Sequence, residues 1–142
     1  NENIFIDFAH TPDALEAVCS ELKKKNHKGL KLVFGAGGDR DQGKRELMGN
    51  VAQKYAKKVY ITSDNPRFEK PEEIIEMIAA GISDKDKVII EPDRAEAISM
   101  AISELNKDEI LLITGKGHEE YQIIGNEKKP FSDYEEILKC IK

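Results

Sequence analysis

Residues 62–67 combine an amide, a rigid proline and a guanidinium within a short stretch. They follow residues 58–61, a β-branched and aromatic run that is typical of a buried strand. Pro66 fixes one backbone angle and biases Asn65 toward an extended conformation, which leaves the neighbouring side chains little freedom. An arginine held in this way can bind a carboxylate or a phosphate through two parallel hydrogen bonds. Arg67 is therefore a candidate binding residue, and the alternative is a surface turn with an incidental arginine.

A glycine-rich loop at residues 35–45 comes close to two phosphate-binding patterns. It starts like a dinucleotide fingerprint, but Arg40 stands where a third glycine would allow close packing of helix on strand. Its spacing also approaches that of a Walker A loop, but Arg45 replaces the serine or threonine that would bind magnesium. Asp39 and Asp41 would repel phosphates. The loop instead projects Arg40 between two carboxylates, which suits an amino acid or another zwitterion.

A second loop at residues 115–119 reads GKGHE. Its glycines allow backbone groups to approach a ligand closely, and Glu119 offers a carboxylate to an ammonium group. His118 is either bonded to backbone or catalytic. The sequence shows no serine or cysteine nucleophile beside a base, and its three histidines are scattered, so we predict no metal site.

The elements that position these loops alternate between strand and helix through five units. The expected strands are residues 4–10, 30–34, 58–61, 88–90 and 109–114. Thr11 is a good N-cap for the first helix, which Asn26 and Gly29 close. Parallel strands end at one edge of a sheet, where α/β proteins bind ligands. The loops after the strands should therefore lie together.

We expect one α/β domain over residues 1–142. Residues 121–131 read as a hairpin near a sheet edge, and residues 134–141 as a last helix. The predicted domain has three layers: a mainly parallel sheet of about six strands with one antiparallel edge strand, and helices on both faces. The continuously apolar strand at residues 109–114 should lie near the centre of the sheet.

Composition excludes several classes of protein. The net charge of −5 argues against nucleic-acid binding, and no apolar stretch is long enough to span a bilayer. Cys19 falls on an apolar stripe far in sequence from Cys140, which favours a reduced core thiol and a cytoplasmic location. The chain shows no signal peptide and opens directly into a strand pattern, which suggests a piece of a longer protein.

Four motifs resemble, in this order, the C-terminal domain of the Mur ligases. They are DFAHTPDAL at 7–15, GGDRDQGKR at 37–45, DNPR at 64–67 and GKGHE at 115–119. The resemblance covers essentially the whole chain and is closest to the members that add meso-diaminopimelate. It implies a Rossmann-like α/β fold.

The resemblance also implies a reaction. In these ligases ATP phosphorylates the D-glutamate carboxylate of UDP-MurNAc-L-Ala-D-Glu, and the amine of the incoming amino acid attacks the acyl phosphate. The C-terminal domain supplies the amino-acid pocket and closes over the nucleotide. ATP and Mg²⁺ are bound mainly by a central domain that this chain lacks, so we expect the isolated chain to be inactive. We also expect a monomer that binds neither nucleic acid nor membrane.

Particular residues acquire roles from the same resemblance. Those assigned to the carboxylates of meso-diaminopimelate are Arg40, Asn65 and Arg67, and Asp64 is a further substrate-binding residue. Those assigned to its distal ammonium are the Gly115 carbonyl and Glu119. Asp7 and His10 resemble residues that meet ATP at the domain boundary, and Lys116 and His118 are candidates for support.

The DNPR motif bears on the choice of substrate. Lysine lacks the distal carboxylate of diaminopimelate, so Arg67 would be left without a partner. Two other functions stay open. One is an amino-acid- or nucleotide-binding module without chemistry, and the other is a different ATP-dependent amide ligase that acts on folate or murein peptides.

Overall fold

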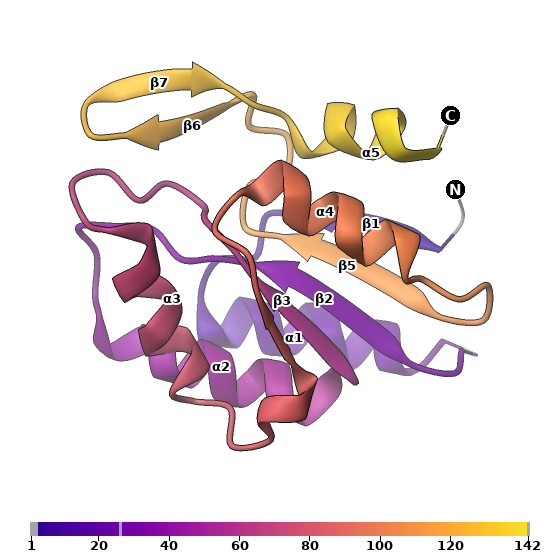
Figure 1. Cartoon of the computed structure of the whole chain (residues 1–142). Coiled ribbons are helices and arrows are strands. Elements are labelled where there is room, and N and C mark those ends of the chain that lie inside the picture. The colour runs from indigo at the N-terminus through magenta and orange to yellow at the C-terminus, as the bar shows by residue number, and fades with distance from the viewer. Residues whose placement is uncertain (1–2, 26, 142) are drawn as a thin grey trace.

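A computed structural model describes residues 3–25 and 27–141 of the chain. Asn26, which we predicted to help close the first helix, lies outside the described residues. Five parallel strands form the main sheet in the order β1-β5-β2-β3-β4 (Figure 1). Their bounds are β1 (Ile4–Asp7), β2 (Leu30–Phe34), β3 (Lys58–Ile61), β4 (Val88–Ile90) and β5 (Ile110–Thr114). β5 lies between β1 and β2 and is buried along its whole length, as expected for a strand inside the sheet.

Each connection between consecutive parallel strands carries a helix. The four helices are α1 (Pro12–Lys23), α2 (Gly43–Tyr55), α3 (Pro71–Ala79) and α4 (Arg94–Ser103). Thr11 caps α1 as predicted, since its side chain accepts from Ala14 N at 3.2 Å. Asp93 caps α4 in the same way and accepts from Glu96 N at 3.3 Å. Of the described helices, none is both long and apolar enough to cross a membrane.

The hairpin predicted at the sheet edge forms a separate sheet. β6 (Tyr121–Ile124) and β7 (Glu127–Pro130) pair antiparallel with each other and with none of the five main strands. The Arg67 N–H donates to Ile123 O at 3.0 Å, and Gly125 N donates to Arg67 O at 2.6 Å. β6 therefore pairs with the loop after β3 instead of extending the main sheet. The α/β class, the mainly parallel sheet and the helices on both faces are confirmed.

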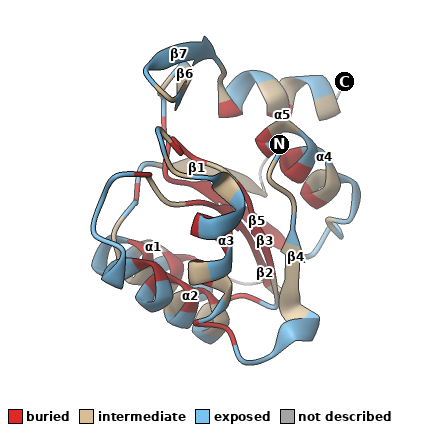
Figure 2. Ribbon diagram, turned by 60° about the vertical axis from the view of Figure 1, so that its left-hand side comes forward, coloured by how far each residue is buried: buried red, intermediate tan, exposed pale blue. Residues whose placement is uncertain are grey.

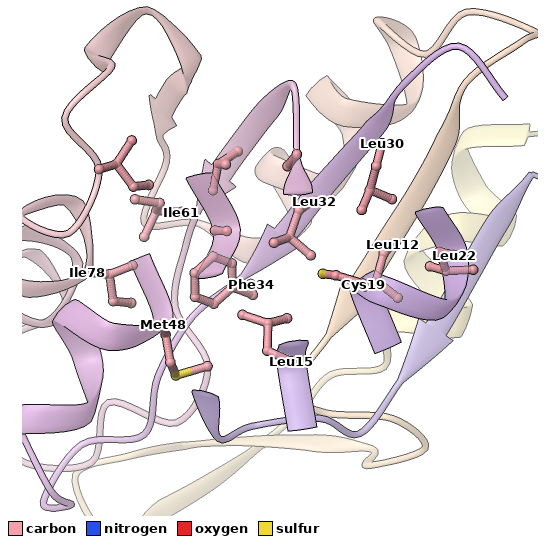
Figure 3. Close-up of a cluster of buried hydrophobic side chains, with 14 of the residues drawn as sticks. Leu15, Cys19, Leu22, Leu30, Leu32, Phe34, Met48, Ile61, Ile78 and Leu112 are labelled. Atoms are coloured by element: carbon pink, nitrogen blue, oxygen red, sulfur yellow. The ribbon is translucent and has the colours of Figure 1, made fainter. Parts of the chain in front are cut away.

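Two apolar layers cover the sheet (Figures 1 and 2). Leu32 and Phe34 of β2 pack with α1, α2 and α3 on one face, whereas Val33 packs with α4 and α5 (Asp133–Ile141) on the other. This alternation is the two-residue period of a strand. Cys19 lies in the first layer, fully buried and free, as the apolar stripe predicted (Figure 3).

Candidate functional site

The loops that leave the carboxyl ends of the parallel strands enclose a cleft of about 430 Å³. Loops after β1, β2, β3 and β5 contribute to its wall. The predicted site residues that line it are His10, Arg40, Asp64, Asn65, Arg67, Gly115 and Glu119. The structure thus brings together all the residues assigned to the amino acid, with Arg67 and Glu119 in one cleft.

The glycine-rich loop (residues 35–45) packs on the DNPR loop (residues 64–67). Gly38 N donates to Asn65 O at 2.7 Å, and a Cβ atom on Gly38 would lie only 1.7 Å from Pro66 O. A Cβ atom on Gly35 would lie 2.2 Å from Thr62 O. These glycines therefore permit close contact between two loops. Close packing between the loops accounts for these glycines, and the glycines make the loop similar to phosphate-binding patterns that it does not complete.

Arg45 connects the glycine-rich loop to the segment before α3 through hydrogen bonds. Its buried guanidinium donates to Gly37 O at 2.9 Å and to both carboxylate oxygens of Glu69 at 2.8 Å. Glu69 also accepts from Asp39 N at 2.6 Å. The hydrogen bonds from Arg45 lower the pKa of Glu69. The sequence identified Arg45 only as a departure from a Walker A loop, and its structural role was missed.

Arg67 adopts a left-handed backbone conformation with φ of 54°. A residue other than glycine seldom does so, and the two backbone hydrogen bonds to Ile123 and Gly125 hold it there. Its Nη1 donates to Gly38 O at 3.1 Å. Within the described part of the chain, Nε and Nη2 have no hydrogen-bond partner. Two donors of the guanidinium thus stay available to a ligand in the cleft.

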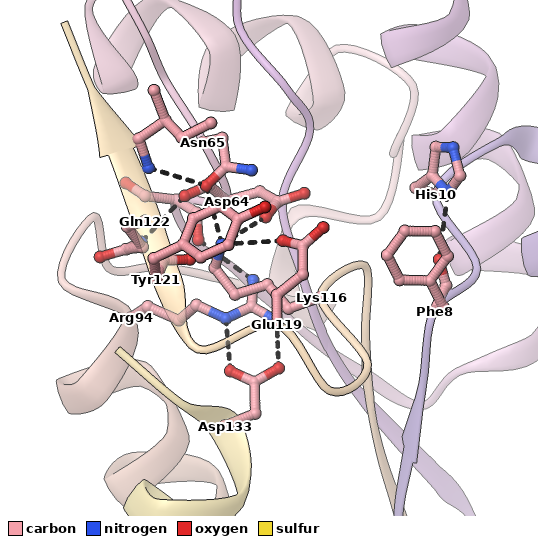
Figure 4. Close-up of polar contacts among 12 residues, drawn as sticks. Phe8, His10, Asp64, Asn65, Arg94, Lys116, Glu119, Tyr121, Gln122 and Asp133 are labelled. Carbon is pink, nitrogen blue, oxygen red and sulfur yellow. Dashed lines mark hydrogen bonds and ion pairs between the residues drawn. The ribbon is translucent and has the colours of Figure 1, made fainter. Parts of the chain in front are cut away.

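Asp64 and Glu119 contribute two carboxylates to the wall of the cleft. Asp64 Oδ1 and Glu119 Oε1 are buried, and neither accepts a hydrogen bond from the described residues. The Lys116 ammonium lies 3.0 Å from Asp64 Oδ1 and 3.7 Å from Glu119 Oε1 (Figure 4). Two carboxylates around one ammonium carry a net charge of −1. Unsatisfied buried acceptors of this kind call for a donor, which an ammonium group of a ligand would supply.

Of the two residues predicted at the nucleotide edge, His10 lines the cleft and Asp7 does not. His10 lines the cleft, is exposed, and has its Nδ1 3.1 Å from Phe8 O. Asp7 does not line it: its Oδ2 accepts from Ala9 N at 2.8 Å, and its carbonyl accepts from Gly115 N at 3.1 Å. Asp7 therefore shapes the loops after β1 and β5. Contact of either residue with a nucleotide stays a prediction.

His118 is exposed and lies outside the cleft wall, and its supporting role stays a prediction. Lys116 is completely buried beneath the cleft. In the ranges 3–25 and 27–141, no group of three or more His, Cys, Asp or Glu side chains is placed to hold a metal ion.

An ion pair that sequence reasoning missed lies under the cleft. Arg94 donates to both carboxylate oxygens of Asp133 at 2.8 Å, and both side chains are fully buried (Figure 4). Arg94 also donates to Ser63 O and Thr114 O, each at 3.1 Å. It thereby joins the carboxyl ends of β3 and β5 to the first turn of α5. The loop after β4 thus contacts the loop after β3, but it contributes no residue to the cleft wall.

Comparisons with known proteins agree with this geometry. Residues 1–117 match the family described as "Mur ligase, glutamate ligase domain". The UDP-N-acetylmuramoyl-L-alanyl-D-glutamate–2,6-diaminopimelate ligase of Rickettsia rickettsii is 53% identical over 144 residues, covering 100% of this chain and 30% of its own length. The ligase of the same name from Aquifex aeolicus is 53% identical over 138 residues, covering 97% and 29%.

Solved structures show the same relationship. A structure of UDP-N-acetylmuramoyl-L-alanyl-D-glutamate–2,6-diaminopimelate ligase superposes with a TM-score of 0.91 at 43% identity, covering 97% of this chain and 28% of that one. A folylpolyglutamate synthase from Thermotoga maritima superposes with a TM-score of 0.56 at 24% identity over 75% of this chain, which is a likeness of fold alone. The chain spans about 30% of the length of the curated relatives it matches. From the family match over residues 1–117 and the relatives that are more than half identical over its whole length, we conclude that the chain belongs to the Mur ligases and corresponds to their glutamate ligase domain.

Proposed function

We propose that this chain is the amino-acid-binding, C-terminal domain of an ATP-dependent ligase that adds meso-diaminopimelate to UDP-MurNAc-L-Ala-D-Glu. One observation carries the proposal. A single cleft holds guanidinium and amide donors from the DNPR loop together with buried, unsatisfied carboxylate oxygens of Asp64 and Glu119. The relatives named for this reaction are about three times longer than the chain, so the reaction is that of the whole protein.

The cleft matches the charges of meso-diaminopimelate, which has a carboxylate and an ammonium at each end. Nε and Nη2 of Arg67 can bind one carboxylate through two parallel hydrogen bonds, and the Asn65 amide lies beside them. Arg40 is exposed and bonds only its neighbour Asp39 within the described chain, so it can turn toward a carboxylate. Glu119 Oε1 and the Gly115 carbonyl would accept from the distal ammonium.

ATP and Mg²⁺ do not fit the residues of this chain. Gly35 and Gly38 of the glycine-rich loop lie against Thr62 O and Pro66 O, where a phosphate cradle would need open space. We therefore propose that other domains hold both, with His10 and Asp7 at the nucleotide edge. The use of ATP and the free thiols of Cys19 and Cys140 support a cytoplasmic enzyme, and we propose that it acts as a monomer without nucleic acid or membrane.

Amino-acid selection by the complete ligase tests the proposal. With UDP-MurNAc-L-Ala-D-Glu and ATP, we expect ADP release and amide formation with meso-diaminopimelate, and little with L-lysine or L-glutamate. The measurement is kcat/KM for each amino acid, with the nucleotide-linked dipeptide omitted as the blank. Preference for L-lysine would reject the substrate, and preference for glutamate with a folate acceptor would favour the folylpolyglutamate class.

The isolated chain should neither hydrolyse ATP nor form an amide. The glycine-rich loop lacks the hydroxyl that binds magnesium, and the neighbouring loop already covers Gly35 and Gly38. Phosphate release by the purified 142-residue chain should equal that of a blank. Robust release that Lys44→Ala abolishes would show that the loop does bind a triphosphate.

A further inference from the structure

The Lys116 ammonium makes two hydrogen bonds and an ion pair within the protein. It donates to Asn65 Oδ1 at 2.8 Å and to Tyr121 O at 3.0 Å, and it lies 3.0 Å from Asp64 Oδ1. A lysine ammonium has three donors and no acceptor. Since the side chain is completely buried and its ammonium lies against these three oxygens, Lys116 is not exposed to a ligand in the cleft. Its role must be exerted through the groups around it.

The Asn65 amide receives both of its hydrogen bonds on one atom. Lys116 Nζ and Ile123 N donate to Oδ1 at 2.8 and 2.9 Å (Figure 4). Neither neighbour can accept a hydrogen bond, so turning the amide over would place its NH₂ group against two donors. Nδ2 consequently points away from Lys116, and none of the described residues accepts from it.

We propose that Lys116 is a positioning residue that sets the polarity of the Asn65 amide. Because Lys116 holds the oxygen, the cleft receives an N–H donor from Asn65 and never its carbonyl acceptor. The group selected at this point is an anion or another acceptor. The inference rests on the proposed function, in which that group is a carboxylate of meso-diaminopimelate.

A double-mutant cycle in the complete ligase tests this role. Lys116→Met keeps the length of the side chain and removes the donor, so KM for meso-diaminopimelate should rise roughly tenfold while KM for ATP stays unchanged. In an Asn65→Ala background the amide is gone and Lys116→Met removes only the ion pairs with Asp64 and Glu119, so it should change KM for the amino acid by a clearly smaller factor than in the wild-type background. A residue that merely supports the fold would raise KM by the same factor in both backgrounds. That result would overturn the proposal.

Asn65→Asp keeps the test available if Lys116→Met does not fold. The aspartate has the shape of asparagine and can accept from both Lys116 Nζ and Ile123 N, but its second oxygen replaces the donor that faces the cleft. We expect this variant to use meso-diaminopimelate at least tenfold less well than Asn65→Ala, because a carboxylate would then face a carboxylate. Equal use by the two variants would also overturn the proposal.

The wild-type enzyme separates this inference from the proposed function. A wild-type ligase that rejects meso-diaminopimelate refutes the proposed function and the inference with it. Wild-type use of this amino acid, combined with independent effects of Lys116→Met and Asn65→Ala, refutes the role of Lys116 alone.

Discussion

Replacing Arg67 with alanine in the complete ligase should lower kcat/KM for meso-diaminopimelate by roughly 30-fold or more. Removing one partner of a buried, hydrogen-bonded charge pair costs about 2–5 kcal/mol. Lysine lacks the distal carboxylate, so its poor use should change little or rise once the unpaired guanidinium is gone. The measurement is the ratio of kcat/KM for the two amino acids in wild type and variant.

Two further variants show whether the guanidinium fork is responsible. Arg67→Lys keeps the charge but loses the planar pair of donors, so it should restore only part of the activity. Phe68→Ala changes the next residue, which is 75% exposed and outside the cleft wall, and should leave the ratio unaltered. Equal loss with both amino acids in Arg67→Ala would mean that the Nη1 contact with Gly38 O, and hence the loop structure, is what matters.

The second large effect concerns stability. Asp133→Ala should lower the free energy of unfolding by about 3–5 kcal/mol, because it leaves the Arg94 guanidinium charged, buried and without its partner. Urea denaturation followed by circular dichroism measures the change. The same variant should loosen the ends of β3 and β5, since Arg94 holds the carbonyls of Ser63 and Thr114.

A matched ion pair on the same helix provides the control. Glu136 pairs with Lys139 at 3.1 Å, but the lysine side chain is 71% exposed. Glu136→Ala should therefore cost less than about 1 kcal/mol. Replacing both Arg94 and Asp133 with apolar residues should recover part of the loss, because no buried charge is then left alone. Equal destabilisation by Asp133→Ala and Glu136→Ala would contradict this account.

Local physical signals predicted the fold. β5 begins with four consecutive apolar residues, and β2 is an apolar run interrupted only by Lys31. Thr11 with Pro12 marks the start of α1 before any tertiary contact is considered. The gathering of Arg67 and Glu119 in one cleft then follows from parallel topology, because their loops leave the same edge of the sheet, with only β2 between β3 and β5. The binding roles of these residues remain predictions.

Contacts between residues far apart in the chain could not be predicted from local sequence patterns. Arg94 and Asp133 are 39 positions apart, and nothing in either local sequence shows that they pair. The left-handed conformation of Arg67 was equally hidden, because Pro66 restricts the residue before it and arginine has no preference for positive φ. The hairpin was recognised from its turn, but its place was not, since β6 bonds to a loop that only the folded chain brings near.

The attachment of β6 to the DNPR loop makes substrate recognition a discontinuous unit. Gln122 Nε2 donates to Asp64 O at 2.9 Å, and Ile123 contacts both Asn65 and Arg67 through its backbone. The conformation of the DNPR loop (residues 64–67) thus depends on a segment more than fifty positions later in the chain. Transplanting the DNPR loop alone into a related ligase would leave behind the strand that shapes it. We therefore expect that an exchange of specificity between this chain and a related ligase has to move both segments together.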